Sequence, residues 1–485
     1  MTTSRKIALL FAAENINAIF GWFALLFVAR KMGASVLGEV SYALSIVGSF
    51  TFLAILGFRM AHIKRVSEGM DLGKCIATFL SIRLVLISFM VVIFVFCLWI
   101  WTNLLGKQLY DIQTPYLIAT ILVYYVLLLL SEVFTSTFSG LKQGARVAIS
   151  KMVMTSVRSI LFIAAAFMGL GAIWLARSYA ISVIFVIFVS LWYFRDLPIS
   201  KPDIKTFNSY KIYAFPVAAA SIFLVFRQFV DKIIIGIFWS VSEVGLYFGV
   251  QRITLFIATM AIAVEEMLFP TISKHHSASE QSEIFSLVHK TEKYVGMVCI
   301  PIVAMTMVFS SEIILVFISR EFLPAFKILQ WLALVALVQV TNRPWSIALR
   351  GSNRPDLVSM VSIFSSIFCI LLMLYLVPSE IPHLGLDNLP GMGGEGAAIG
   401  ILVSEILGGI TLRILCYKFF GIALRENTKV LILDESSAAL DLDSTERLFK
   451  KMRELKDRGV AVFIVTHRIA ELVRISDKAT VMRDG

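Results

Sequence analysis

Residues 76–101 read IATFLSIRLVLISFMVVIFVFCLWIW and contain a single charged side chain. A helix of about 20 consecutive apolar residues is long enough to cross the hydrocarbon core of a bilayer. The whole chain of 485 residues has the same character, with 58% hydrophobic residues, 16% charged residues and a mean hydropathy of +0.84. Soluble globular chains hold about 45–50% apolar and about 25% charged residues. The composition therefore indicates a membrane protein.

Similar apolar segments recur along most of the chain. They fall at about 7–29, 37–58, 76–101, 114–138, 152–167, 173–194, 212–237, 247–270, 294–318, 326–347, 357–377 and 398–420. The first run follows Arg5 and Lys6, as in a signal peptide, but it is too long and lacks a small-residue cleavage site. We therefore expect an all-α polytopic membrane protein with about twelve transmembrane helices, plus a short α/β fragment in the water-soluble tail.

The lysines and arginines of the loops favour one orientation of these helices. With the N-terminus in the cytoplasm, the outer loops hold only Arg30, Lys31, Lys107 and Arg320, and the inner loops hold the remaining loop cations. Cytoplasmic loops carry the excess of Lys and Arg in membrane proteins. The pattern predicts a multi-pass protein of the cytoplasmic (inner) membrane with both termini in the cytoplasm. It also accounts for the net charge of +11 without nucleic-acid binding.

Two short stretches indicate an internal repeat. Residues 28–42 read VARKMGASVLGEVSY and residues 236–247 read GIFWSVSEVGLY, and each places a glycine shortly before an aromatic residue after a short outer turn. Parallel repeats of six helices build two-lobed transporters with a central cavity. We expect a first lobe at 1–210, a second lobe at 211–421, and the separate tail fragment at 428–485.

Several further motifs resemble those of polysaccharide flippases of the Wzx type, within the multidrug/oligosaccharidyl-lipid/polysaccharide exporter superfamily. The resemblance covers about residues 1–420 and is carried by GASVLG at 33–38, LGF at 56–58, FP at 215–216, DKIIIG at 231–236, SEVGLY at 242–247 and LFP at 268–270. It implies a transporter rather than an enzyme, which carries an isoprenoid-diphosphate-linked oligosaccharide across the membrane by alternating access. It implies no cofactor for transport, and polymerase or glycosyltransferase machinery as partners.

Charged residues inside the predicted helices are candidates for a substrate site. Each costs about 2.5–3.5 kcal/mol on insertion scales and usually faces a cavity or a partner. Arg158 and Arg227 lie near the middle of their helices. We expect them to line a cationic cavity for a diphosphate headgroup, which the planar guanidinium binds well. Arg177 and Arg252 are assigned to the same cavity, with an equal case for a purely structural role.

Carboxylates in the same segments are candidates for coupling transport to H⁺ or Na⁺, and we assign Glu14 and Asp231 to this role. Arg227 and Asp231 are four residues apart, so one continuous helix would let them pair. Structural pairing or snorkelling is the expected role of other membrane charges: Glu265, Glu266, Arg343 and Arg413. The cysteines and histidines show no metal-ligand spacing.

The tail follows a different pattern from the rest of the chain. An apolar strand at 430–433 ends in Asp434 and Glu435, an amphipathic helix follows, and a second apolar strand at 461–465 ends just before His467. These motifs and their spacing resemble the second half of an ABC-transporter nucleotide-binding domain, most similar to those of sugar importers. The resemblance implies Asp434 as the residue that holds Mg²⁺ through water, Glu435 as the general base, residues 437–441 with Asp441 as the D-loop, and His467 as the switch histidine.

Two elements that ATP hydrolysis requires have no counterpart in the sequence. No G-x-x-x-x-G-K-[ST] loop is present to cradle the phosphates, and no Leu-Ser-Gly-Gly-Gln signature. Residues 436–437 are Ser-Ser where that family has Pro-Thr. We expect the fragment to be inactive in ATP hydrolysis by itself, and to be a fusion scar, a truncated gene or a joined neighbouring reading frame. Two alternatives to the flippase remain: a multidrug or cation antiporter of the same superfamily, and an ATP-binding ABC-transporter component completed by a partner chain.

Overall fold

The computed structural model describes residues 3–104, 114–278, 280–381, 385–420, 430–434, 442–457, 461–465 and 474–477. The chain divides into two compact units, residues 1–414 and 415–485. The helices of the first unit, in chain order, are α1 (Thr3–Ser49), α2 (Phe52–Ile55), α3 (Phe58–Ser67), α4 (Leu72–Trp99), η1 (Ile100–Leu104), α5 (Thr114–Gly140), α6 (Gly144–Phe167), α7 (Ala172–Phe194), α8 (Ile204–Arg227), α9 (Val230–Phe238), α10 (Val241–Ser277), α11 (Gln281–Val308), α12 (Ser310–Phe317), η2 (Arg320–Ala325), α13 (Phe326–Gly351), α14 (Pro355–Leu376) and α15 (Gly393–Phe419), the last of which crosses the boundary between the units.

Helices account for nearly all of the first unit, as the hydropathy pattern predicts. Among the described residues, nine helical segments are long and apolar enough to span a membrane. The first predicted segment and the first part of the second form one helical element, α1, interrupted at Gly33 (φ 82°, ψ 178°), and the rest of the second segment forms α2 and the start of α3. Such a backbone conformation is accessible to glycine without steric strain. The fold is that of a polytopic helical membrane protein, and the exact number of spans and the division into two lobes stay predictions.

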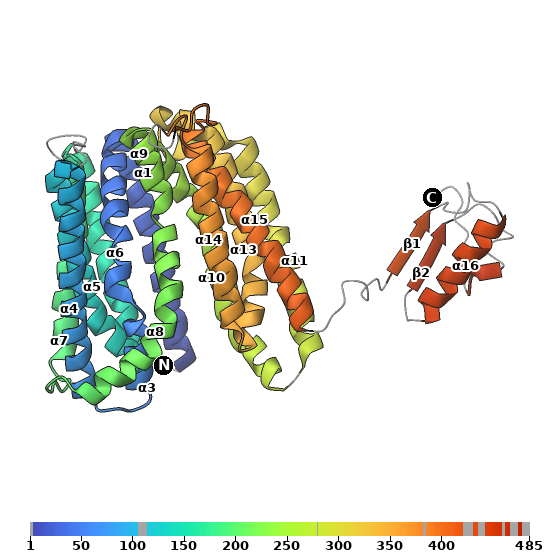
Figure 1. Cartoon of the computed structure of the whole chain (residues 1–485), viewed down its shortest axis with the longest axis horizontal. Coiled ribbons are helices and arrows are strands. Elements are labelled where there is room, and N and C mark those ends of the chain that lie inside the picture. The colour runs from blue at the N-terminus through green and yellow to red at the C-terminus, as the bar shows by residue number, and fades with distance from the viewer. Residues whose placement is uncertain are drawn as a thin grey trace. The chain divides into compact units, whose positions relative to one another are not determined.

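The helices α4, α5, α6 and α7 lie in one group, and α10, α11, α13, α14 and α15 lie in another (Figure 1). Side-chain oxygens cap the first turns of α4, α8 and α10. Asp71 accepts a hydrogen bond from the amide of Lys74 at the start of α4, and Ser240 accepts one from Glu243 at the start of α10. The partly exposed Asp203 caps α8 through the amide of Thr206, and this hydrogen bond lowers the pKa of its carboxyl group.

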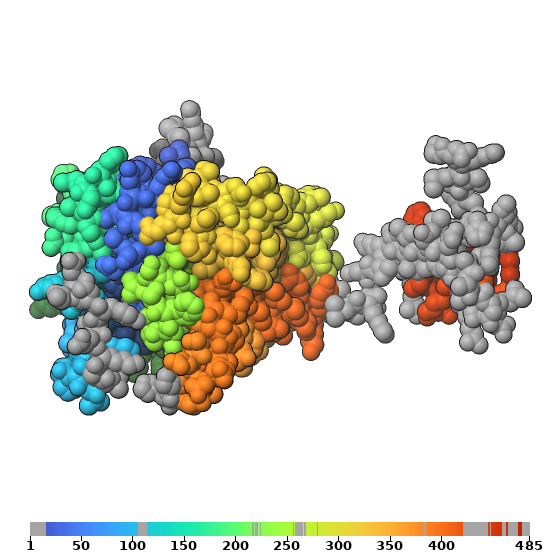
Figure 2. Space-filling view, turned by 90° about the horizontal axis from the view of Figure 1, so that it is seen from above, coloured from blue at the N-terminus to red at the C-terminus, as the bar shows by residue number. Residues whose placement is uncertain are grey.

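At the end of the unit that carries Gly33, α1 makes direct contact with elements of the second half of the chain. Arg30 donates a hydrogen bond to the carbonyl of Val316 (3.0 Å), and the amide of Ala34 donates one to Glu321 (2.7 Å). Seen from above in Figure 2, the blue surface of the first fifty residues adjoins green and yellow surface from the later helices. These hydrogen bonds join α1 to the region of α12 and η2 at this end of the unit.

One predicted helix is broken in the structure. The apolar segment at 212–237 forms α8 and α9, and Gln228 and Phe229 lie between them. Interrupted helices at membrane depth are tolerated where they line a cavity, because the freed backbone groups then have polar surroundings. Both residues of this break line the cavity described below.

A buried histidine, His62, joins α3, α5 and α8 in the first unit. His62 of α3 is completely buried, its Nδ1 lies 2.8 Å from the Tyr210 hydroxyl, and its Nε2 lies 2.8 Å from the Thr137 hydroxyl. The Thr137 hydroxyl donates to the carbonyl of Val133, so it accepts from the Nε2–H group of the ring. Nδ1 is then the acceptor for Tyr210. The Tyr210 hydroxyl also lies 3.4 Å from the carbonyl oxygen of Cys75, but its contact with Nδ1 is shorter and therefore the stronger hydrogen bond. With one ring nitrogen donating and the other accepting, the imidazole is neutral.

The neutral state of His62 makes the stability of the protein depend on pH. Burial, reinforced by the positive charge of Arg83, lowers the pKa of His62 from 6.5 to about 3. The unfolded chain binds a proton on this residue below pH 6.5, whereas the folded chain does not. We therefore expect the contribution of His62 to stability to be full above pH 6.5 and to be lost by about 1.4 kcal/mol per pH unit as the pH falls toward 3.

Thermal unfolding of the purified protein over a pH series measures this effect. The variant His62→Gln should show a shallower fall in melting temperature between neutral and acidic pH than the wild-type chain. His276→Gln is the matched control, because His276 is a partly exposed histidine near the end of α10. An equal acid-dependent fall in wild type and His62→Gln would contradict the assignment.

The second unit contains a β–α–β element. Strand β1 (Val430–Asp434) pairs in parallel with β2 (Ala461–Val465), and α16 (Leu442–Asp457) connects them. Both predicted strands and the predicted amphipathic helix are confirmed. Asp434 is the last residue of β1 and lies in register with Val465. Glu435, Asp441 and His467, the other residues assigned to nucleotide chemistry, lie outside the described residues.

Candidate functional site: a cationic cavity in the helical unit

A cavity of about 1350 Å³ lies among the helices of the first unit. Both halves of the chain contribute to its wall, from α1 and α5 through α15. Representative residues, one from each of these helices, are Ser41, Tyr124, Arg158, Tyr179, Arg227, Asp231, Arg252, Ile302, Ile313, Gln339, Cys369 and Glu405. Drug-sized ligand pockets have volumes of about 300–1,000 Å³. The cavity is therefore large enough for a bulky polar ligand.

Among the residues that the structure describes, four cationic and two anionic side chains line this cavity. The cations are Arg158, Arg227, Lys232 and Arg252, and the anions are Asp231 and Glu405. Arg227 forms an ion pair with Glu405, and Lys232 forms one with Asp231. Both carboxylates are thereby neutralised within the wall. The remaining two arginines give the described part of the wall a net positive charge.

Arg158 and Arg252 have no carboxylate partner in the part of the chain that the structure describes. Each guanidinium lies over an aromatic ring instead, that of Arg158 5.2 Å from the ring centre of Tyr179 and that of Arg252 4.2 Å from the ring centre of Phe248. Arg252 is further positioned through its backbone carbonyl, which accepts a hydrogen bond from Trp22 (2.6 Å). Stacking on an aromatic face fixes a guanidinium but leaves its N–H donors available to a ligand.

Arg158 and Arg252 come from different halves of the chain. Arg158 belongs to α6 and Arg252 to α10, and the two charges are close enough to repel one another. An anion placed between them would relieve this repulsion and accept hydrogen bonds from both guanidinium groups. The arrangement is chemically suited to an anion between the two halves.

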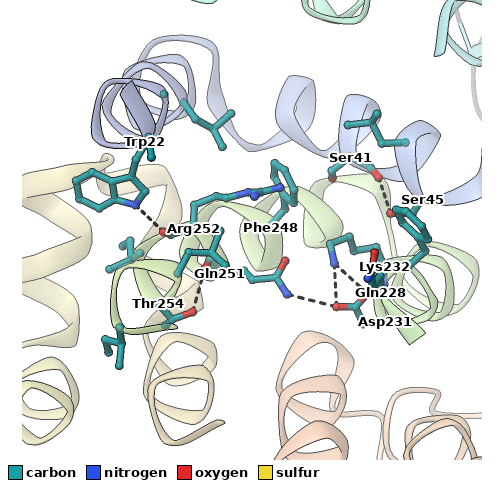
Figure 3. A pocket seen from close by; sticks show the side chains of 18 of the residues that line it. Trp22, Ser41, Ser45, Gln228, Asp231, Lys232, Phe248, Gln251, Arg252 and Thr254 are labelled. Atoms are coloured by element: carbon teal, nitrogen blue, oxygen red, sulfur yellow. Dashed lines mark hydrogen bonds and ion pairs between the residues drawn. The ribbon is translucent and has the colours of Figure 1, made fainter. Parts of the chain in front are cut away.

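The predicted ion pair between Arg227 and Asp231 is wrong. Arg227 is the last residue of α8 and Asp231 lies in α9, so the helix break separates their faces. Arg227 pairs with Glu405, which also accepts a hydrogen bond from Gln339 (3.1 Å). Lys232 pairs with Asp231, and Gln251 also lies near that carboxylate (Figure 3). Residues four positions apart share a face only within a continuous helix, and the break removes that condition here.

The remaining charged residues singled out from the sequence do not belong to the described cavity wall. Arg177 does not line this cavity: it is exposed, and its guanidinium lies over Trp174 of the same helix at 4.8 Å. The side chain of Glu14 lies outside the described part of α1. Structural pairing is confirmed for Glu265, which binds Arg343 and Arg350, and for Arg413, which binds Glu292, whereas the side chain of Glu266 is not described.

Three residues of the cavity wall were not predicted as site residues: Lys232, Glu405 and Gln251. Lys232 and Glu405 are charged residues within apolar segments, so the same insertion argument that singled out Arg158 applies to them. Gln251 carries no charge, and its role follows only from its contact with Asp231. Among the residues that the structure describes, no cluster of His, Cys, Asp and Glu with the geometry of a metal site is present.

Comparisons with known proteins agree with this architecture. A family model described as polysaccharide biosynthesis protein matches residues 4–276. The protein named "Probable low-salt glycan biosynthesis flippase Agl15" from Haloferax volcanii is 27% identical over 383 residues, which are 78% of this chain and 78% of that protein. The solved structure of lipid II flippase MurJ in an inward closed conformation superimposes with a TM-score of 0.69 at 16% identity, covering 96% of this chain and 95% of that one.

The tail has relatives of its own. The ribose import ATP-binding protein RbsA of Yersinia pestis is 37% identical over 82 residues, which are 17% of this chain but only 16% of that protein. The match agrees with the ABC-domain resemblance of the tail sequence. It covers a small fraction of an ATP-binding protein.

Proposed function

Because the chain belongs to the polysaccharide biosynthesis protein family, we propose that it translocates a lipid-linked oligosaccharide with an anionic diphosphate group across the cytoplasmic membrane by alternating access. The observation that carries the proposal is the pair of arginines, Arg158 and Arg252, that project from opposite halves of the chain without a carboxylate partner among the described residues. A diphosphate diester carries one negative charge on each phosphate group. Its charge therefore matches that of the two arginines.

The cavity also suits the remainder of such a ligand. Its wall combines the arginines with serine, threonine, glutamine and tyrosine side chains, including Ser41, Gln228 and Thr254 (Figure 3). Hydroxyl and amide groups are the usual partners of sugar hydroxyl groups, and aromatic rings provide apolar stacking faces. The glycan flippase from Haloferax volcanii and the lipid II flippase MurJ are named for the same class of cargo.

Alternating access would follow from the position of the anion site between the two halves. In the predicted orientation, contacts such as that of Arg30 with Val316 would join the two halves at the outer end. A ligand bound by arginines of both halves stabilises whichever arrangement brings them together, and so couples binding to the movement. We further propose that both termini lie in the cytoplasm, and that polymerase or glycosyltransferase enzymes use the translocated product.

Neither alternative function fits the cavity as well. A cationic drug, the substrate class of the antiporter alternative, would meet a wall with net positive charge. For the ABC alternative, the tail spans 16% of the ribose importer subunit, and the sequence contains no phosphate-binding loop. We propose that transport requires neither ATP nor Mg²⁺ at Asp434.

Reconstitution in vesicles tests the proposed function. The purified chain is incorporated with a polyprenyl-diphosphate oligosaccharide whose glycan can be cut by a membrane-impermeant glycosidase. Without transport, the glycosidase cuts only the glycolipid of the outer leaflet. We expect the protein to raise the fraction of glycolipid that is cut toward all of the glycolipid in the vesicles, at equal rates with and without Mg-ATP. A chain ending at Phe420 should behave identically.

Three outcomes would contradict the proposal in different ways. No increase in accessible glycan would exclude the flippase activity. Transport of a fluorescent organic cation against an ion gradient, without glycolipid movement, would establish the antiporter. Glycolipid movement that requires Mg-ATP and is lost in Glu435→Gln would establish ATP-driven transport through the tail.

A further inference from the structure

The ion pair between Asp231 and Lys232 is buried in the wall of the cavity, with relative exposures of 3% and 6%. The two residues are neighbours in the chain, at the start of α9 and directly after the helix break. The ammonium group of Lys232 lies 2.9 Å from both carboxylate oxygens of Asp231. A cation therefore sits symmetrically on the carboxylate that the sequence singled out for ion coupling.

Protein donors surround both oxygens of Asp231. The backbone amide of Lys232 donates to Oδ1 (2.8 Å), the ammonium donates to both oxygens, and Gln251 Nε2 approaches Oδ2 at 3.5 Å (Figure 3). A carboxylate has about four lone-pair positions for partners. An external cation would therefore have to displace the lysine to reach Asp231.

The surroundings of the ammonium are rich in oxygen. Tyr247 is completely buried beside this pair, with its ring centre 5.7 Å from the ammonium nitrogen. Its buried hydroxyl lies next to the carboxylate of Asp231. The carboxylate and this hydroxyl are hard oxygen ligands, which suit small cations rather than transition metals.

We infer that the ammonium of Lys232 occupies the position of a monovalent coupling cation at Asp231, so that the wild-type protein binds no Na⁺ there and removal of the ammonium creates a Na⁺ site. A tethered cation neutralises Asp231 at all Na⁺ concentrations. The consequence for transport rests on the proposed function, whereas the presence or absence of the site does not. The sequence left both H⁺ and Na⁺ open as the coupling ion at Asp231, and this inference excludes Na⁺ binding there in the wild-type protein.

The variant Lys232→Met tests whether Na⁺ can bind at Asp231 once the ammonium is removed. Methionine keeps an unbranched side chain of similar length but leaves Asp231 as a buried carboxylate without its partner, which is strongly destabilising. Binding of Na⁺ to the folded state should restore stability in proportion to the ion concentration, because a ligand that binds only the folded protein raises its melting temperature. The double variant Asp231→Asn/Lys232→Met has no charge to neutralise and serves as the matched control.

The experiment compares melting temperatures and radioactive ²²Na⁺ binding of the purified proteins in NaCl and in choline chloride of equal ionic strength. We expect a saturable Na⁺-specific rise in melting temperature and stoichiometric ²²Na⁺ binding in Lys232→Met alone. Wild type and the double variant should show neither response. Because no glycolipid is present, the result is independent of whether the protein is a flippase.

Three results would overturn the inference. One is specific stabilisation and binding by Na⁺ in the wild-type protein that Asp231→Asn removes. Another is a folded Lys232→Met variant that ignores Na⁺. The third is a Lys232→Met variant that can be purified in neither salt although the double variant purifies in both, because Na⁺ then cannot replace the ammonium.

Discussion

Replacing Arg158 or Arg252 by alanine is expected to weaken glycolipid binding by about 10- to 100-fold, because a charge-assisted hydrogen bond contributes about 1.5–3 kcal/mol and each 1.4 kcal/mol is a factor of ten. Neither arginine has a carboxylate partner among the described residues, and the two repel one another. Their removal leaves no buried carboxylate unpaired. The melting temperature should therefore change little while transport falls.

The initial rate of glycan exposure, measured over a series of glycolipid concentrations, separates this loss from a loss of folding. Arg158→Lys should fall between wild type and Arg158→Ala, because lysine keeps the charge but not the bidentate fork. Arg177→Ala is the matched control, since Arg177 is an exposed arginine on α7 outside the cavity wall. Equal losses of transport rate in Arg158→Ala and Arg177→Ala would show that the loss does not come from ligand binding in the cavity.

Adding a single methyl group at Gly38 or Gly245 is expected to separate the two halves at their outer contact. A Cβ atom at Gly38 would lie 1.9 Å from the carbonyl oxygen of Val241, and one at Gly245 would lie 1.8 Å from that of Ala34. Both obstacles are backbone atoms, which no side-chain rotation can remove. Small residues let helices approach this closely in membranes, and overpacking costs about 1–3 kcal/mol.

Each of Gly38→Ala and Gly245→Ala should lower the melting temperature of the purified protein and increase the labelling of the outer contact by membrane-impermeant reagents. The double variant should be only slightly worse than either single variant, because separation of α1 from α10 relieves both clashes at once. Gly144→Ala is the control, since Gly144 lies in α6 with no atom within 4 Å of its Cβ position. Full additivity of the two substitutions would disprove a shared contact.

The crossing at Gly38 and Gly245 also gives physical meaning to the short repeat in the sequence. Each glycine lies against the carbonyl of the residue four positions before the other glycine, Val241 in one case and Ala34 in the other. The repeat was recognisable because close backbone approach restricts the side chain at both positions. Which surfaces would meet was not visible, since the two segments are about two hundred residues apart in the chain.

The charged residues show the limit of sequence reasoning at the site. Arg158, Arg227 and Arg252 were identified because charge in an apolar segment is expensive, and all three line the cavity. The same argument included Arg177, which instead stacks on Trp174 outside the cavity wall. Hydropathy measures the cost of a charge at a given depth. It does not measure the direction in which the helix presents that charge.

The sequence alone determined the parts of this protein that depend on local composition. About twenty neighbouring side chains decide whether a segment enters a bilayer, and two apolar strands with an amphipathic helix between them determine the β–α–β element. Only the tertiary structure decided which charges are neutralised. Glu405 lies 178 residues from Arg227, and the break after α8 turns Asp231 toward Lys232 rather than Arg227. Coulomb energies depend on the distance between charges in space, and the chain separates in sequence what the fold brings together.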